Sequence, residues 1–161
     1  MPVESMSGKL DASQRSRVLL FIGAVISILW SVYFSVVTIM IPYQIELREG
    51  TALVLTKILL SGGNPFSFDN LPLGMTNYGL GYNLAVLPFA ALFGNTLVVH
   101  RAVTFAFILL AASVVFLSLN KSARDPALAL TCSAFLMTGL ITNGGIGAFP
   151  SAMGAFLFSV I

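Results

Sequence analysis

Residues 18–40 read VLLFIGAVISILWSVYFSVVTIM, a run of 23 residues without a charged side chain. About 20 apolar residues are enough for a helix to cross a bilayer. The run is too long for the core of a cleaved signal peptide, and no small-residue cleavage site follows it, so we expect an uncleaved anchor. The polar tail 1–17 carries Lys9, Arg15 and Arg17, which places the N-terminus in the cytoplasm and residue 41 onward outside.

The composition of the whole chain agrees with this membrane assignment. Of the 161 residues 57% are hydrophobic and only 9% are charged, whereas soluble domains have about 25% charged residues. A net charge of +2 without a basic cluster argues against a nucleic-acid partner. The single cysteine, Cys132, lies in an apolar run, where we interpret it as a packing residue.

Further apolar runs follow at residues 79–94, 102–119, 127–141 and 148–161. Pro88 interrupts the first of them, and the last stops after 14 residues, which suggests the N-terminal piece of a longer protein. We therefore predict an all-α membrane protein, a polytopic helical bundle. Its cytoplasmic tail is 1–17, its transmembrane domain is 18–161, and an amphipathic helix lies on the membrane in the first outer loop, 41–78.

Four complete crossings would divide the basic residues evenly between the two sides of the membrane. Lys9, Arg15, Arg17 and Arg101 would lie inside, and Arg48, Lys57, Lys121 and Arg124 would lie outside. The positive-inside rule then decides only the first helix. If the run at 79–94 were re-entrant instead, the connector 121–125 would move to the inside.

The first outer loop contains the predicted interfacial helix, at residues 49–61. Its broad apolar face consists of Leu53, Leu55, Ile58 and Leu59. A narrow polar strip of Arg48, Ala52 and Thr56 lies beside Glu49 and Lys57. Gly62 and Gly63 end the helix, because glycine adopts the left-handed conformation of a helix C-cap, and Pro65 prevents its continuation.

The candidate chemistry lies in the charged residues Glu46, Arg48 and Glu49. No P-loop, GxGxxG, HExxH or CxxC motif is present in the chain. A carboxylate near the lipid headgroups is partly desolvated, which raises its pKa and suits it to accept a proton. The alternative is that these residues are interfacial charges solvated by headgroups and water.

Five short motifs occur in order: ELREG (46–50), GNPF (63–66), NYG (77–79) with Tyr82, FG (93–94) and HR (100–101). Across residues 18–120 this arrangement resembles the GT-C superfamily, and within it family 39 and the polyprenyl-phosphate-sugar mannosyltransferases. These polytopic glycosyltransferases take a sugar from a lipid-phosphate carrier. Relatives carry an aspartate about where this chain has Gln44, and another about where it has Ser151.

The resemblance implies sugar transfer with inversion. We expect no cofactor, and a divalent metal ion is compatible with the resemblance but unsupported by the residues present. Glu46 or Glu49 would be the catalytic base that accepts the proton of the acceptor hydroxyl. The substrate-binding residues would be Arg48, Lys57 and Arg101, which stabilise the leaving phosphate, and Asn77 and Tyr78, which orient a substrate. The implied partners are the bilayer, a lipid-linked sugar donor and an unknown glycan, lipid or protein acceptor, in a bacterial inner (plasma) membrane.

Two other functions are compatible with the sequence. A small multispan transporter or a lipid-carrier translocase subunit is suggested by the short, proline-interrupted run at 79–94, since transporters often contain broken helices. The uncharged spans argue against it, because ion pathways usually contain a charged residue. A non-catalytic membrane scaffold is the third possibility.

Overall fold

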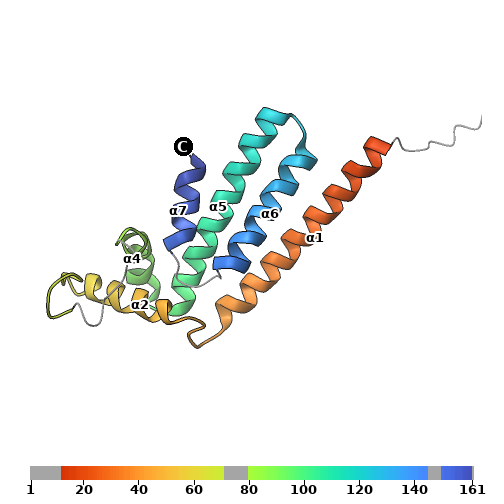
Figure 1. Ribbon diagram of the computed structural model, residues 1–161. Coiled ribbons are helices and arrows are strands. Elements are labelled where there is room, and N and C mark those ends of the chain that lie inside the picture. Colours follow the sequence, from red (N-terminus) through yellow and green to blue (C-terminus); the bar gives the residue numbers. More distant parts are fainter. Residues whose placement is uncertain (1–11, 71–79, 145–149, 161) are drawn as a thin grey trace, which may run out of the picture.

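The computed structural model of the protein describes residues 12–70, 80–144 and 150–160, and these residues form helices and turns without a strand. The helices are α1 (Ala12–Met40), α2 (Leu47–Leu60), α4 (Gly81–Phe93), α5 (Leu97–Ala123), α6 (Pro126–Gly144) and α7 (Pro150–Val160). Helix α6 packs between α1 and α5, and α7 packs on α5, whereas α2 and α4 lie together where α1 ends (Figure 1). For the residues described, the predicted all-α class is confirmed.

Two helices in the described part of the chain are long and apolar enough to cross a membrane, Gln14–Met40 and Leu97–Ala123. Two shorter apolar helices accompany them, Gly81–Phe93 and Pro126–Thr142. Much of the apolar surface of α1 is not covered by the rest of the chain: Leu19 is 70% exposed and Leu29 is 64% exposed. A large uncovered apolar surface is typical of contact with lipid or with another protein.

Small residues determine where α1 meets α6. Ser27, Ser31 and Ser35 recur at every fourth position and therefore lie along one side of α1. The Oγ atoms of Ser27 and Ser31 lie 2.7 and 3.0 Å from Oγ1 of Thr138 on α6. Small side chains allow two helix backbones to approach closely, and shared hydroxyl contacts then hold them together.

The turn between α5 and α6 is built from local signals. Arg124 adopts a left-handed conformation with a φ of 50° and ends α5. The Oδ1 atom of Asp125 accepts hydrogen bonds from the backbone N–H groups of Ala127 and Leu128, at 3.1 and 3.2 Å. Asp125 therefore caps α6, and Pro126 occupies the first helical position, where a missing N–H costs nothing.

Helix α4 does not carry the chain to the other end of the bundle, as the predicted crossing at 79–94 would require (Figure 1). Near the start of α4, Nδ2 of Asn83 donates to the carbonyl of Ala52 on α2, at 2.9 Å. Just after its end, Nδ2 of Asn95 donates to the carbonyl of Leu53, also at 2.9 Å. The 13 residues of α4 span about 20 Å, which is short of the roughly 30 Å core of a bilayer.

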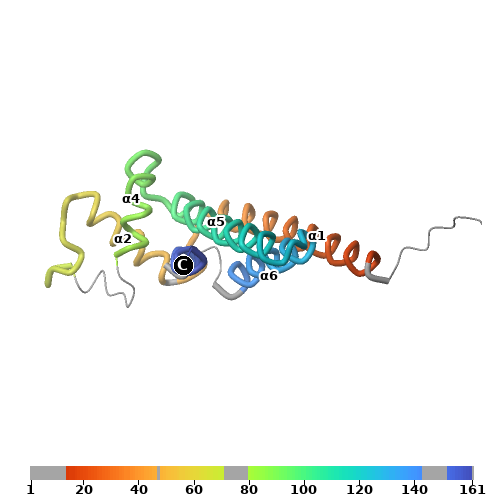
Figure 2. Tube along the Cα trace, turned by 90° about the horizontal axis from the view of Figure 1, so that it is seen from above, coloured from red at the N-terminus to blue at the C-terminus, as the bar shows by residue number. Residues whose placement is uncertain are grey.

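Because α4 stays beside α2, α5 begins at the same end of the bundle at which α1 finishes. Seen from above, α1, α5 and α6 lie alongside one another, with α2 and α4 beyond one end (Figure 2). The connector after α5 then lies near the start of α1, where Arg17 and Asp125 form an ion pair at 3.5 Å. This is the arrangement expected of the re-entrant alternative.

Helix α2 occurs close to its predicted position, and its buried side includes Leu55 of the predicted apolar face together with two residues of the predicted polar strip. Gly62 adopts a φ of +75° and follows the end of the helix, as predicted. Ala52 and Thr56, assigned to an exposed polar strip, are buried. The reason is Asn83, whose amide donates to Thr56 Oγ1 at 3.0 Å and so fixes that strip against α4.

Candidate functional site

The centre of the candidate site is an ion pair between Glu49 on α2 and Arg101 on α5. The Nε and Nη2 atoms of Arg101 donate to Oε1 and Oε2 of Glu49 at 2.7 and 2.8 Å. Both side chains are 0% exposed. Two parallel N–H···O bonds between a guanidinium and a carboxylate are among the strongest hydrogen bonds in proteins. The pair joins the ELREG and HR motifs, which are far apart in the sequence.

The remaining donors of Arg101 hold the segment that leaves α1. Nη1 donates to the carbonyls of Thr38 and Ile41 at 2.9 and 2.6 Å, and Nη2 donates to the carbonyl of Tyr43 at 2.9 Å. With the two bonds to Glu49, all five N–H groups of the guanidinium are engaged. Carbonyls at a helix C-terminus lack partners within the helix and favour a cation. Arg101 therefore fixes the end of α1, the start of the loop, and α2.

The environment of Glu49 stabilises its ionised form. Burial by itself would raise the pKa of the Glu49 carboxyl. The hydrogen bonds from Arg101 and from the backbone N–H of Ile45, together with the guanidinium charge, outweigh burial and lower that pKa below its ordinary value. A buried carboxylate with a lowered pKa and engaged oxygens is a poor general base. The geometry therefore suits Glu49 to holding α2 against α5 and not to accepting a proton.

Glu46 lies immediately before α2 and is accessible. Its Oε1 atom lies 2.8 Å from Nε of Arg48, and the two side chains are 35% and 55% exposed. Glu46 occupies the N-cap position of α2, where its side chain makes no capping hydrogen bond. A carboxylate near a helix N-terminus is favoured by the helix dipole. Of the two predicted acids, Glu46 is the one that solvent can reach.

A buried polar network, which the sequence reasoning missed, connects α4 to α5 beside the ion pair. The Tyr82 hydroxyl donates to the carbonyl of His100 at 3.0 Å and lies 3.1 Å from Oγ1 of Thr104. Nε2 of His100 lies 2.9 Å from Oδ1 of Asn95, and its Nδ1 has no hydrogen-bond partner. The available signal was the presence of asparagine and histidine within or beside apolar runs, since buried polar groups need partners.

The other predicted residues are not brought into the ion-pair centre. Lys57 is exposed on α2, and Gln44 is exposed in the segment before it. Asn77 and Tyr78 lie outside the described residues, as does the side chain of Ser151. Among the residues whose placement is described, no group of three or more His, Cys, Asp or Glu side chains is arranged to hold a metal ion.

No family model, no curated protein and no solved structure matches this chain. The fold and the site thus define an all-helical protein with two helices able to span a membrane. At one end of its bundle a buried ion pair anchors a charged loop.

Proposed function

We propose that the protein is a membrane glycosyltransferase that moves a sugar from a polyprenyl-phosphate carrier to an acceptor hydroxyl with inversion. The observation that carries this proposal is the Glu49–Arg101 ion pair. Two motifs of the GT-C resemblance, ELREG and HR, meet in this one buried contact, although Glu49 and Arg101 are 52 residues apart in the sequence. That contact supports the motifs being parts of a single site, with an accessible acid, Glu46, next to it.

The charge distribution supports an N-terminus on the cytoplasmic side of the membrane, which we propose is a bacterial plasma membrane. Because α4 stays at the end of the bundle where α1 finishes, the opposite end, where α1 begins, has four exposed basic residues: Arg15, Arg17, Lys121 and Arg124. The other end has Arg48, Lys57 and Arg101, and Glu49 neutralises Arg101. The earlier even division therefore becomes an excess at the N-terminal end, which the positive-inside rule places in the cytoplasm.

In the proposed mechanism Glu46 accepts the proton of the acceptor hydroxyl as its oxygen attacks the anomeric carbon. The sugar–phosphate bond breaks on the opposite face, which gives inversion through an oxocarbenium-like state. The phosphate leaves as a lipid phosphate, and its charge is stabilised by the exposed cations of α2, which are Lys57 and Arg48, the latter also paired with Glu46. Arg101 has no donor to spare, so its role is to hold the loop and not to bind phosphate.

The test is the Glu46→Gln variant, assayed in membranes against a panel of polyprenyl-phosphate hexoses. We expect transfer to fall about 100- to 10,000-fold, because that is the usual contribution of a general base. Asp69→Asn is the matched control, since it removes an exposed carboxylate from the same loop and should leave the rate unchanged. The amount of inserted protein should be equal in all samples.

Two results would contradict the proposal. A wild-type rate in Glu46→Gln would exclude Glu46 as the base. Carrier movement across the bilayer without any glycosidic bond formed would instead favour the translocase alternative.

A further inference from the structure

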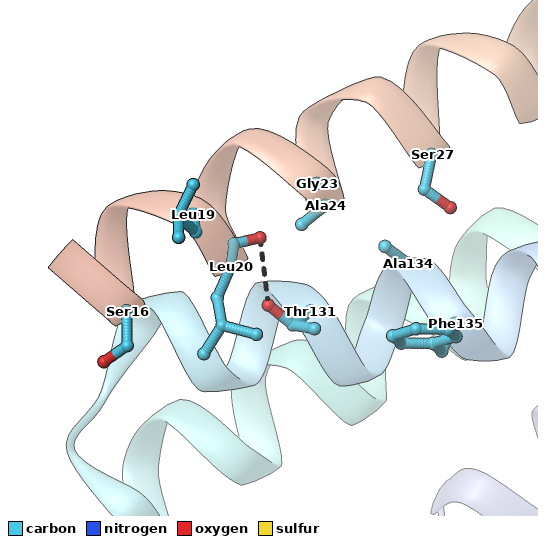
Figure 3. A pocket seen from close by; sticks show the side chains of 9 residues that line it. All are labelled: Ser16, Leu19, Leu20, Gly23, Ala24, Ser27, Thr131, Ala134 and Phe135. Atoms are coloured by element: carbon cyan, nitrogen blue, oxygen red, sulfur yellow. Dashed lines mark hydrogen bonds between the residues drawn. The ribbon is translucent and has the colours of Figure 1, made fainter.

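A groove with a volume of about 510 Å³ runs between α1 and α6, in the half of the bundle that contains the start of α1 (Figure 3). Its deepest residues are small: Ala24 is 3% exposed and Ala134 is 2% exposed. Its outer residues are large and apolar: Leu19 is 70% exposed and Phe135 is 74% exposed. The groove is thus an apolar slot that opens on the surface that α1 would present to lipid.

Gly23 keeps this slot open. A Cβ atom built on Gly23 would meet no atom within 4 Å, whereas one built on Gly81 would lie 2.9 Å from the Met153 Cε. Glycine inside a helix costs about 1 kcal/mol relative to alanine. No contact within the described chain requires that cost at Gly23. The room above Gly23 is therefore available to a molecule from outside the chain.

The charges near the groove indicate what kind of molecule would enter. Ser16 lines the end of the groove nearest the N-terminus, and the exposed residues Arg15 and Arg17 flank it in the sequence. Lys121 and Arg124 add positive charge at the same end of the bundle, and Asp125 is the one acid there among the described residues. Basic residues beside a slot between membrane helices attract anionic lipid headgroups.

We propose that this groove binds one acyl chain of an anionic phospholipid, with the phosphate held at Arg15 and Arg17. The chain would lie against Gly23, Ala24 and Ala134, where its methylene groups replace empty space with contacts. The lipid belongs to the leaflet at the start of α1, opposite the end that holds Glu46. The inference requires a membrane location but does not depend on sugar transfer.

The experiment compares Gly23→Leu with Gly154→Leu in the full-length chain by native mass spectrometry. A Cβ at either glycine meets nothing within 4 Å, so neither variant introduces a clash at Cβ, and only Gly23 lines the groove. The probes are palmitoyl-oleoyl phosphatidylglycerol and the matching phosphatidylcholine. We expect Gly23→Leu to lower phosphatidylglycerol retention about tenfold, equivalent to roughly two methylene contacts, and Gly154→Leu to retain it.

A second measurement addresses the headgroup. Replacing Arg15 and Arg17 together by Gln should reduce the preference for phosphatidylglycerol over phosphatidylcholine by about tenfold or more, since each basic residue contributes on the order of 1 kcal/mol. A phosphatidylglycerol analogue with a diazirine in its acyl chain should label α1 and α6 of the wild type. This labelling does not depend on the folding of any variant.

Three outcomes would overturn the proposal: equal retention by Gly23→Leu and wild type, equal affinity of the wild type for both lipids, or labelling that avoids α1 and α6. A dimer that Gly23→Leu abolishes would overturn it as well, because the groove would then be an interface between two copies of the chain.

Discussion

The two ends of the helical bundle use charge in opposite ways. Where α1 finishes, Glu49 and Arg101 are fully buried and paired, and the guanidinium also binds backbone carbonyls. Where α1 begins, Arg15 and Lys121 are exposed to solvent. Buried charges must be satisfied in full and therefore fix geometry. Exposed charges fix little geometry, but their sum affects membrane orientation and lipid attraction.

Arginine therefore has two different roles at the two ends, and the sequence alone does not distinguish them. One arginine, Arg101, holds three segments of the chain together. Another, Arg17, makes only a longer contact of 3.5 Å to Asp125 and is 64% exposed. A count of basic residues treats the two as equal, although they differ in energy and in role.

The largest expected effect concerns which end lies on which side of the membrane. In a chain with Cys132 replaced by serine, cysteines placed at the exposed positions Asp69 and Ser122 should be labelled from opposite sides. A membrane-impermeant maleimide added to intact cells should label the cysteine at 69 and leave the one at 122 unlabelled. Labelling of both from the same side would mean that an odd number of crossings lies between α2 and α5.

Arg101→Met should be the most destabilising single substitution at the site. It leaves Glu49 buried without a counterion, and breaking one partner of such a pair typically costs about 3–5 kcal/mol. Thermal unfolding in detergent micelles measures the loss. Arg48→Met is the matched control, because Arg48 forms an exposed pair with Glu46, and such pairs contribute about 0–1 kcal/mol. Similar losses in both variants would show that burial does not distinguish the two ion pairs.

Acid should weaken the buried end selectively. The pKa of Glu49 is lower in the folded protein than its ordinary value of 4.5, so the unfolded chain takes up its proton first as the pH falls. The stability contributed by this carboxylate is complete above that ordinary value and is lost below it. We expect the melting temperature to fall as the pH is lowered below about 4.5. In Glu49→Gln the melting temperature should be lower at neutral pH, and this component of the acid slope should be absent.

The smallest expected effect concerns the α1–α6 contact. Ser27→Ala removes one hydroxyl near Thr138, and such contacts between membrane helices contribute about 0.6 kcal/mol on average. A double-mutant cycle with Thr138→Val in detergent should give a coupling of this order. A coupling several times larger would mean that α1 and α6 are held mainly by polar contacts and less by close packing of small residues.

Local signals in the sequence predicted most of the helices. The uncharged run 18–40 lies within α1, and Gly62 follows the end of α2 as expected. The destination of α4 was not predictable in this way. Its length and Pro88 allowed either a crossing or a return, and the contacts of Asn83 and Asn95 with α2 accompany the return.

The site was predictable in composition but not in arrangement. Glu46, Glu49 and Arg101 were all singled out, but 52 residues separate the last two, and the predicted crossing placed them on opposite sides of the membrane. The choice between the two acids also depended on tertiary structure. Adjacent turns of chain give Glu46 access to solvent and bury Glu49, and no local pattern distinguishes them.

The position of α4 determines the direction in which each later helix runs along the bundle. Because α2 and α4 stay at one end of the bundle, each later helix runs in the opposite direction to the one expected from four successive crossings. Helix α6 then delivers the chain back to the face that holds Glu46, and α7 starts from there, with Met153 approaching Gly81. The first turns of α7 are thus neighbours of α4, at the end of the bundle that holds the Glu49–Arg101 ion pair.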